Sequence, residues 1–148
     1  MEIERYFELI VEPTIADFEA NPTSVRHAFL AALAVFHSID YLNAKRDRKN
    51  FRDASADFAL VDRIAHAFKH VHTGHPADPN LQPLSSAGVI ARPPMYYTVS
   101  GAYGLSRYND AVGGVTLEGD RAVDVLSAIK AAAHFVRQQC ESQPDAKT

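Results

Sequence analysis

The sequence has little cysteine and no long hydrophobic run. A single cysteine, Cys140, excludes an internal disulfide, and the first residues, MEIERYFELI, lack the cationic and then apolar pattern of a signal peptide. The longest apolar run, from Ala28 to Phe36, has about half the length of a bilayer-spanning helix. We therefore expect a protein of the reducing cytoplasm that does not reside in a membrane.

Strong charge and nucleotide-binding motifs are absent as well. The net charge is -3 and there is no basic tail, so bulk electrostatics does not indicate nucleic-acid binding, although a local basic patch can still bind RNA. Neither a GxxxxGK[ST] motif nor a GxGxxG motif after a strand occurs, and we expect no cofactor. The 148 residues are enough for one domain, residues 1–148, with its own hydrophobic core.

The distribution of glycine divides the chain into two parts. None occurs in the first 73 residues, and all seven lie from Gly74 onward. Apolar periodicity and boundary residues predict four helices, at about residues 2–19, 22–46, 54–71 and 121–141. Between the last two, residues 74–119 predict an irregular insertion with a β-hairpin formed by 95–100 and 113–119, and 89–91 as a candidate third strand. The predicted fold class is mainly α, a four-helix-bundle-like domain with a small β-hairpin insertion.

Boundary and core residues of these helices are also predicted. Asn21, followed by Pro22, is the expected N-cap of the second helix, and Asp120 that of the last. The second helix is apolar nearly all round, which is typical of a helix surrounded by others, so we expect Leu33 and Phe36 to be buried. The third helix should turn six apolar residues inward, namely Phe58, Val61, Ile64, Ala65, Phe68 and Val71.

The stretch DRIAHAFKHVHTGH, residues 62–75, holds four of the seven histidines. At 100° per residue, Arg63, His66 and His70 cluster on one side of the third helix, roughly opposite Ile64 and Phe68. The simplest interpretation is a solvated polar face whose cations complement the dipole at the helix C-terminus.

A second interpretation is a metal-binding helical bundle. His66 and His70 are spaced i,i+4, so both can reach one ion. Further ligands would be His37 and Asp40, spaced i,i+3 on the second helix, if the two helices pack antiparallel with these faces together. His37 and Asp40 can equally form a pair that satisfies itself at a packed interface.

A third interpretation starts from Arg63 and His70, an Arg-x6-His spacing on a late helix of a small α-bundle. This pattern resembles the HEPN superfamily of ribonucleases and RNA-binding modules, over the first three helices at most. The resemblance implies a homodimer whose cleft brings together Arg63 and His70 of two protomers. Arg63 would stabilise a phosphorane-like transition state and His70 would transfer protons during attack by a ribose 2′-hydroxyl. It further implies RNA as the substrate, no need for metal, and an antitoxin-like protein partner.

Two further patterns leave the function open. The segment DFALVDRIAHAFKHV also resembles uncharacterised bacterial helical proteins with Lys-His at a helix end and a glycine-rich β segment after it, which implies no activity. An aromatic and basic cluster could stack RNA bases, although such residues more often pack across strands; it comprises Tyr96, Tyr97, Tyr103, Tyr108, Arg92 and Arg107. The remaining classes are an RNA-directed enzyme or binder using Arg63 and His70, and a non-enzymatic homo-oligomeric interaction or scaffold protein.

Overall fold

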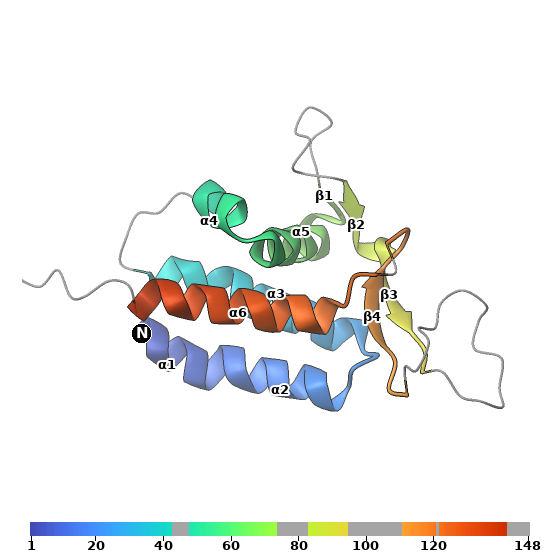
Figure 1. Ribbon diagram of the computed structural model, residues 1–148, viewed down its shortest axis with the longest axis horizontal. Coiled ribbons are helices and arrows are strands. Elements are labelled where there is room, and N and C mark those ends of the chain that lie inside the picture. The colour runs from blue at the N-terminus through green and yellow to red at the C-terminus, as the bar shows by residue number, and fades with distance from the viewer. Residues whose placement is uncertain (43–47, 74–82, 95–110, 121, 142–148) are drawn as a thin grey trace, which may run out of the picture.

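The computed structural model describes residues 1–42, 48–73, 83–94, 111–120 and 122–141 (Figure 1). Most of these residues are helical, as predicted. The helical elements are α1 (Ile3–Tyr6), η1 (Phe7–Val11), α2 (Glu12–Ala20), α3 (Val25–Ser38), η2 (Ile39–Tyr41), α4 (Arg48–Ala54), α5 (Ala56–His70), η3 (Ser86–Gly88) and α6 (Val125–Glu141). The strands are β1 (His72–Thr73), β2 (Leu84–Ser85), β3 (Val89–Arg92) and β4 (Gly114–Leu117). None of the described helices is long and apolar enough to cross a membrane.

Helical rods form the body of the molecule, with α1 to α2 as the first of them, and the predicted mainly α class is confirmed. In Figure 1, α1 and α2 run along one side of the α3 and α6 pair, α4 and α5 lie on the other side, and the strands gather at one end. Packing between α3, α5 and α6 and between α2, α3 and α6 buries one continuous apolar core. Its largest fully buried apolar side chains are Phe18, Phe58, Ile64, Ile129, Val11, Val35, Val61, Val115, Val125 and Val136.

The first rod continues through Pro13 with a change of helix type. Proline offers no backbone N–H and its ring crowds the preceding turn, so an ordinary α-helix would kink there. The turn before it, η1, is instead a π-helix, and Pro13 falls in the first turn of α2. The wider π turn accommodates the proline without ending the rod. Phe7, Val11 and Phe18 therefore all face the core, whereas Ile10 lies at the surface.

The predicted start of the second helix is wrong, because a serine caps α3. Asn21 ends α2, where its side chain donates to the carbonyl of Asp17 at 2.9 Å, and α3 begins after Ser24, whose Oγ accepts the His27 N–H at 3.3 Å. The α-helical part ends at Ser38, and residues 43–46 of the predicted helix lie outside the described residues. The predicted third helix, 54–71, corresponds to α5, whose cap is Ser55; the Ser55 Oγ accepts the Phe58 N–H at 3.1 Å. The short helix α4 before it was not predicted.

The last helix also begins later than predicted. Asp124 is its cap, since its Oδ2 accepts the Ser127 backbone N–H at 3.3 Å, whereas the N–H of Asp120 bonds to the carbonyl of Leu117 in the turn after β4.

The inward side of α5 was predicted wrongly at its end, because Phe68 and Val71 are 48% and 58% exposed. Val71 takes a positive φ of 67°, which ends the helix before this residue can follow the apolar stripe.

The β insertion lies between α5 and α6, as predicted, and its described strands form two antiparallel pairs. β4 pairs antiparallel with β3, which contains the segment expected as a third strand, while the expected partner at 95–100 lies outside the described residues. β1 pairs with β2 next to the end of α5. Gly113 has φ +77° and Gly114 lies beside the Arg92 guanidinium, so a Cβ at either position would collide with its surroundings.

The central helix α3 is not surrounded on every side. Phe36 is buried against His66 of α5 and Arg48 of α4, as expected for this residue. Leu33 is only partly buried, and Leu30 is 43% exposed. The prediction of an all-round buried helix is therefore wrong for the side of α3 that carries Leu30, because apolar character alone does not state what covers a residue.

Candidate functional site

The side of α5 that carries Arg63, His66 and His70 is called here the histidine flank. His66 is partly exposed, and its Nδ1 lies 2.8 Å from the backbone oxygen of Asp62, one turn earlier. Because a carbonyl oxygen only accepts hydrogen bonds, Nδ1 must carry the proton, and Nε2 of the neutral ring is left as an acceptor. The edge of the same ring contacts Phe36 with centroids 5.1 Å apart. Two contacts therefore fix the orientation of this imidazole.

His70 lies beside His66 on the exposed part of the flank. The two ring centroids are 6.0 Å apart with an interplanar angle of 25°. This spacing follows from their i,i+4 relation, which places side chains one above the other on a helix. The structure thus brings the two imidazoles together, with one ring held in place and the other open to solvent.

Arg63 lies one turn before His66, at the i,i+3 position of the same flank. It is partly buried, and burial lowers the pKa of its guanidinium, while the charge of Asp120 in the turn after β4 opposes this change. Its pKa remains far above neutrality for any such change, so the side chain is a fixed cation. Arg63 and His70 are two turns apart, about 10 Å along the helix axis, with His66 between them.

A buried carboxylate, Asp62, lies beside His66 on the core side of the histidine flank. The sequence analysis assigned no role to this residue. Asp62 is 2% exposed; its Oδ2 lies 3.4 Å from Arg52 of α4 and its Oδ1 3.6 Å from Nδ1 of His66. Within the described residues Oδ1 has no hydrogen-bond partner. A signal was present in the sequence, because Asp62 is spaced i+4 from Phe58 and i−3 from Ala65, both predicted to face inward.

Arg48 and Arg52 of α4 bring two cations to this buried carboxylate and its aromatic neighbour. The Arg48 guanidinium lies 4.3 Å from the centroid of the Phe36 ring, and Arg52 contacts Asp62. Both arginines belong to α4. Arg48 beside Phe36 and Arg52 beside Asp62 thus bring two positive charges close to the histidine flank, which suits the approach of an anion.

The four residues proposed as metal ligands do not form one site. His37 Nδ1 lies 2.9 Å from Asp40 Oδ2, so these two satisfy each other on α3. Nδ1 of His66 is engaged by the backbone of Asp62. Among the described residues, no three side chains of His, Cys, Asp or Glu are grouped so as to hold one ion. The histidines of α5 and the pair on α3 are thus two separate features.

Arg92, proposed as part of a base-stacking cluster, is buried. Its side chain is 4% exposed, with Nη2 lying 3.7 Å from Asp124 at the start of α6. A guanidinium in this position ties β3 to α6 and cannot stack on an exposed base. Tyr96, Tyr97, Tyr103, Tyr108 and Arg107 lie outside the described residues.

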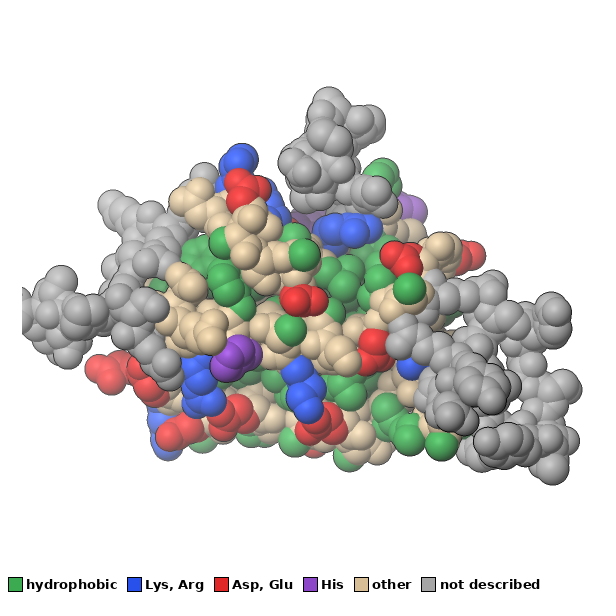
Figure 2. Space-filling model, in the orientation of Figure 1, with side chains coloured by type: hydrophobic (Ala, Val, Ile, Leu, Met, Phe, Trp, Pro, Cys, Tyr) green, Lys and Arg blue, Asp and Glu red, His purple; other side chains and the backbone are tan. Residues whose placement is uncertain are grey.

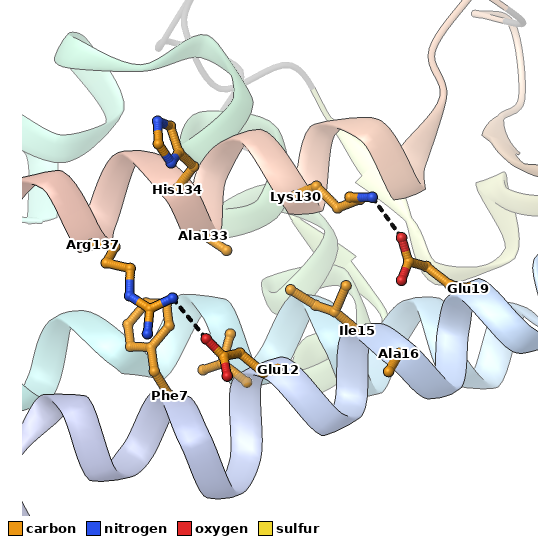
Figure 3. A pocket seen from close by; sticks show the side chains of 10 residues that line it. Phe7, Glu12, Ile15, Ala16, Glu19, Lys130, Ala133, His134 and Arg137 are labelled. Atoms are coloured by element: carbon orange, nitrogen blue, oxygen red, sulfur yellow. Dashed lines mark hydrogen bonds and ion pairs between the residues drawn. The ribbon is translucent and has the colours of Figure 1, made fainter.

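A surface groove between α2 and α6 has a volume of about 250 Å³ and is closed at both ends by ion pairs (Figure 3). Lys130 bonds Glu19 at 2.5 Å and Arg137 bonds Glu12 at 2.7 Å. His134 points away from α2. Figure 2 likewise shows basic and acidic side chains next to one another on this face. The charges of this groove are mutually neutralised, so it offers less to an anion than the histidine flank does.

Comparisons with protein-family models, with curated proteins and with solved structures gave no match. The chemistry of the histidine flank is therefore inferred from its own residues and distances.

Proposed function

We propose that this chain is a HEPN-like, RNA-directed module that acts as a metal-independent endoribonuclease through its histidine flank. The observation that carries the proposal is the position of His66, whose Nδ1 is engaged by Asp62 and whose ring lies beside His70. A neutral imidazole held in one tautomer next to a second imidazole is the arrangement that acid–base catalysis needs. The proposed catalytic residues differ from those of the sequence prediction, because His66 is added to Arg63 and His70.

The reaction proposed is transesterification within RNA. Nε2 of His66 accepts the proton of a ribose 2′-hydroxyl, and the 2′-oxygen attacks the adjacent phosphorus. The bond from phosphorus to the 5′-oxygen breaks as that oxygen takes a proton from His70. The products are a 2′,3′-cyclic phosphate and a 5′-hydroxyl, and atoms and charge balance without a metal ion or a co-reactant.

Arg63 supplies the positive charge for this step. Negative charge builds on the phosphate oxygens in the transition state, and a fixed guanidinium on the same side of the helix stabilises it. Because Arg63 is partly buried, its charge is less screened by water than that of an exposed arginine.

We propose a homodimer in the reducing cytoplasm as the working form, with an antitoxin-like protein that inhibits by covering the histidine flank. The single cysteine is consistent with a reducing compartment. A homodimer is consistent with the exposed apolar side chains on α3.

The test is a cleavage assay on single-stranded RNA in excess chelator, with analysis of the product ends. The purified chain should cleave RNA and leave cyclic phosphates. Arg63→Ala, His66→Ala and His70→Ala should each reduce the rate by about 100-fold or more. His134→Ala is the matched control, an exposed histidine on α6, and should leave the rate unchanged.

The alternative function is a non-enzymatic homo-oligomeric interaction protein, and the exposed Leu30 on α3 favours it. Absence of cleavage and of RNA affinity in the chain, together with a stable oligomer, would establish this alternative. Cleavage that stops in chelator would contradict the metal-independent mechanism.

A further inference from the structure

The outer side of α3 carries a regular stripe of four residues, here called the α3 stripe. Arg26, Leu30, Leu33 and His37 recur at spacings of four, three and four, which places them within an arc of about 60° on the helix. The opposite arc holds fully buried residues, Ala28, Ala31, Ala32 and Val35. The α3 stripe therefore lies on the outer side of α3, with Leu33 still in contact with the edge of the core. Asp40, three residues after His37, lies in η2 and extends the α3 stripe at its C-terminal end.

The centre of the α3 stripe is apolar and open. Leu30 is 43% exposed, and with Leu33 it lines a surface groove of about 330 Å³ between α3 and the first helical rod. Ile10 contributes a further exposed apolar side chain to this groove. A spacing of four and three with leucines at the centre is the pattern by which one helix packs against another.

The charges at the two ends of the α3 stripe have opposite sign. Arg26 precedes Leu33 by seven residues, and Asp40 follows it by seven. If a second copy of α3 lies antiparallel across Leu33, Arg26 of each copy meets Asp40 of the other, whose carboxylate also pairs with His37 of its own chain. Leu30 then meets the neighbourhood of His37. A parallel arrangement would instead place Arg26 against Arg26 and Asp40 against Asp40, which is unfavourable.

We infer that the α3 stripe is the interface of a two-fold symmetric homodimer, with the two α3 helices antiparallel and centred on Leu33. A two-fold interface uses the same surface on both subunits and must complement itself, and this stripe does so in shape and charge. The inference deepens the homodimer part of the proposed function and does not depend on RNA cleavage.

The location of this interface relates it to the histidine flank. Phe36 contacts His37 of the stripe with ring centroids 4.9 Å apart and His66 of the flank at 5.1 Å. One aromatic ring thus separates the two surfaces. In the dimer, the second copy would border the histidine flank on its α3 side, and each flank would face the groove between protomers.

The test measures the mass of the full chain in solution, without RNA, by light scattering and sedimentation. The wild-type chain should have twice the mass of one chain, and Leu30→Glu should be monomeric. Leu9→Glu is the matched control, because Leu9 is similarly exposed, at 49%, but does not line the groove, and it should remain dimeric. Circular dichroism of each variant checks that the helices are kept.

A charge exchange tests the antiparallel register. Arg26→Asp and Asp40→Arg should each weaken the dimer by about tenfold or more, and the double variant should restore it. A monomeric wild-type chain at its highest soluble concentration would overturn the inference, as would a dimer that Leu30→Glu does not affect. A dimer without RNA cleavage would refute the proposed activity and leave this interface standing. Cleavage by a monomeric chain would refute this interface and the homodimeric working form, and would leave the proposed activity standing.

Discussion

Helices α3 and α5 depart from the usual burial pattern in opposite ways. α3 exposes the side chain of Leu30 on its outer side, while α5 buries the carboxylate of Asp62 on its inner side. Each departure is costly, since an exposed leucine forgoes about 1.5 to 3 kcal/mol of burial and a buried charge loses several kcal/mol of hydration. In α3 the cost is recovered if a second copy covers the stripe. In α5 it is offset by Arg52 and by the placement of His66.

The α3 stripe and the histidine flank differ in the contacts that characterise them. Leu30 of the α3 stripe is exposed in the single chain, and the second copy that we infer over it is argued from the charges of Arg26 and Asp40. The histidine flank is recognised by what lies under it, because Asp62 orients His66 before any ligand arrives. Orientation in advance is what distinguishes this flank from a merely solvated histidine cluster.

The largest effect is expected for Phe36→Ala on the inner side of α3. Removing this buried ring leaves a cavity beneath His66 and Arg48 and should lower the free energy of unfolding by about 3 to 5 kcal/mol. Denaturant titration measures it. Leu30→Ala on the outer side is the matched control and should cost well under 1 kcal/mol in a monomeric background. Equal losses for both variants would show that the two sides of α3 do not differ.

Asp62→Ala should have the next largest effect. It leaves Arg52 beside an apolar core without its carboxylate, and removal of one member of a buried pair costs about 3 kcal/mol. Thermal unfolding measures the loss. Asp62→Asn keeps the side-chain volume and an oxygen that can accept from Arg52, so a smaller loss is expected. Asp53→Ala, which removes an exposed partner of Lys49, is the control, and a similar cost for both would contradict the importance of burial.

Alkaline pH should reveal Tyr6, which lies in the groove beside the α3 stripe. Its hydroxyl donates to the carbonyl of Ala34 at 3.0 Å, and burial, aided by Tyr41 and Asp40, raises its pKa to about 12. An unfolded tyrosine ionises near pH 10, so the native state is fully favoured below that pH and loses this stabilisation as pH rises toward 12.

The expected loss from Tyr6 is about 1 kcal/mol between pH 9 and pH 11, measured by denaturant titration. Tyr6→Phe should lower stability at neutral pH but remove this part of the pH dependence. An unchanged alkaline slope in Tyr6→Phe would mean that Tyr6 is not held as a neutral donor.

The smallest effect is expected for the exposed ion pairs between α2 and α6. Arg137→Ala and Lys130→Ala should each cost less than about 1 kcal/mol, and high salt should remove most of the difference from wild type. Arg137 also lies 5.2 Å from the centroid of the Phe7 ring, so its loss should slightly exceed that of Lys130. A loss comparable with that of Asp62→Ala would contradict the distinction between buried and exposed pairs.

Sequence patterns predicted the class of fold and most of its core, because apolar periodicity records which side of a helix is buried. They placed Phe58, Val61, Ile64 and Ala65 of α5 correctly. Boundaries were less certain, since Ser24, Ser55 and Asp124 compete with Asn21 and Asp120 as caps, and several residues in a row can fill this role.

The candidate site was predicted only in part. Helical spacing placed Arg63, His66 and His70 on one flank, but the role of Asp62 depends on α4 folding back over α5, which no local pattern specifies. The all-round apolar character of α3 likewise did not reveal that one side lacks a cover in a single chain. Both omissions concern contacts between elements rather than the elements themselves.

The most direct test of the central claim is to map where RNA binds. Histidine ring signals of the full chain would be followed by nuclear magnetic resonance during titration with a single-stranded 2′-O-methyl RNA, which cannot be cleaved by 2′-hydroxyl attack. The signals of His66 and His70 should shift, and those of His134 on α6 should not. Shifts confined to His134, or no histidine shift at saturating RNA, would contradict the assignment of the histidine flank as the RNA-contacting surface.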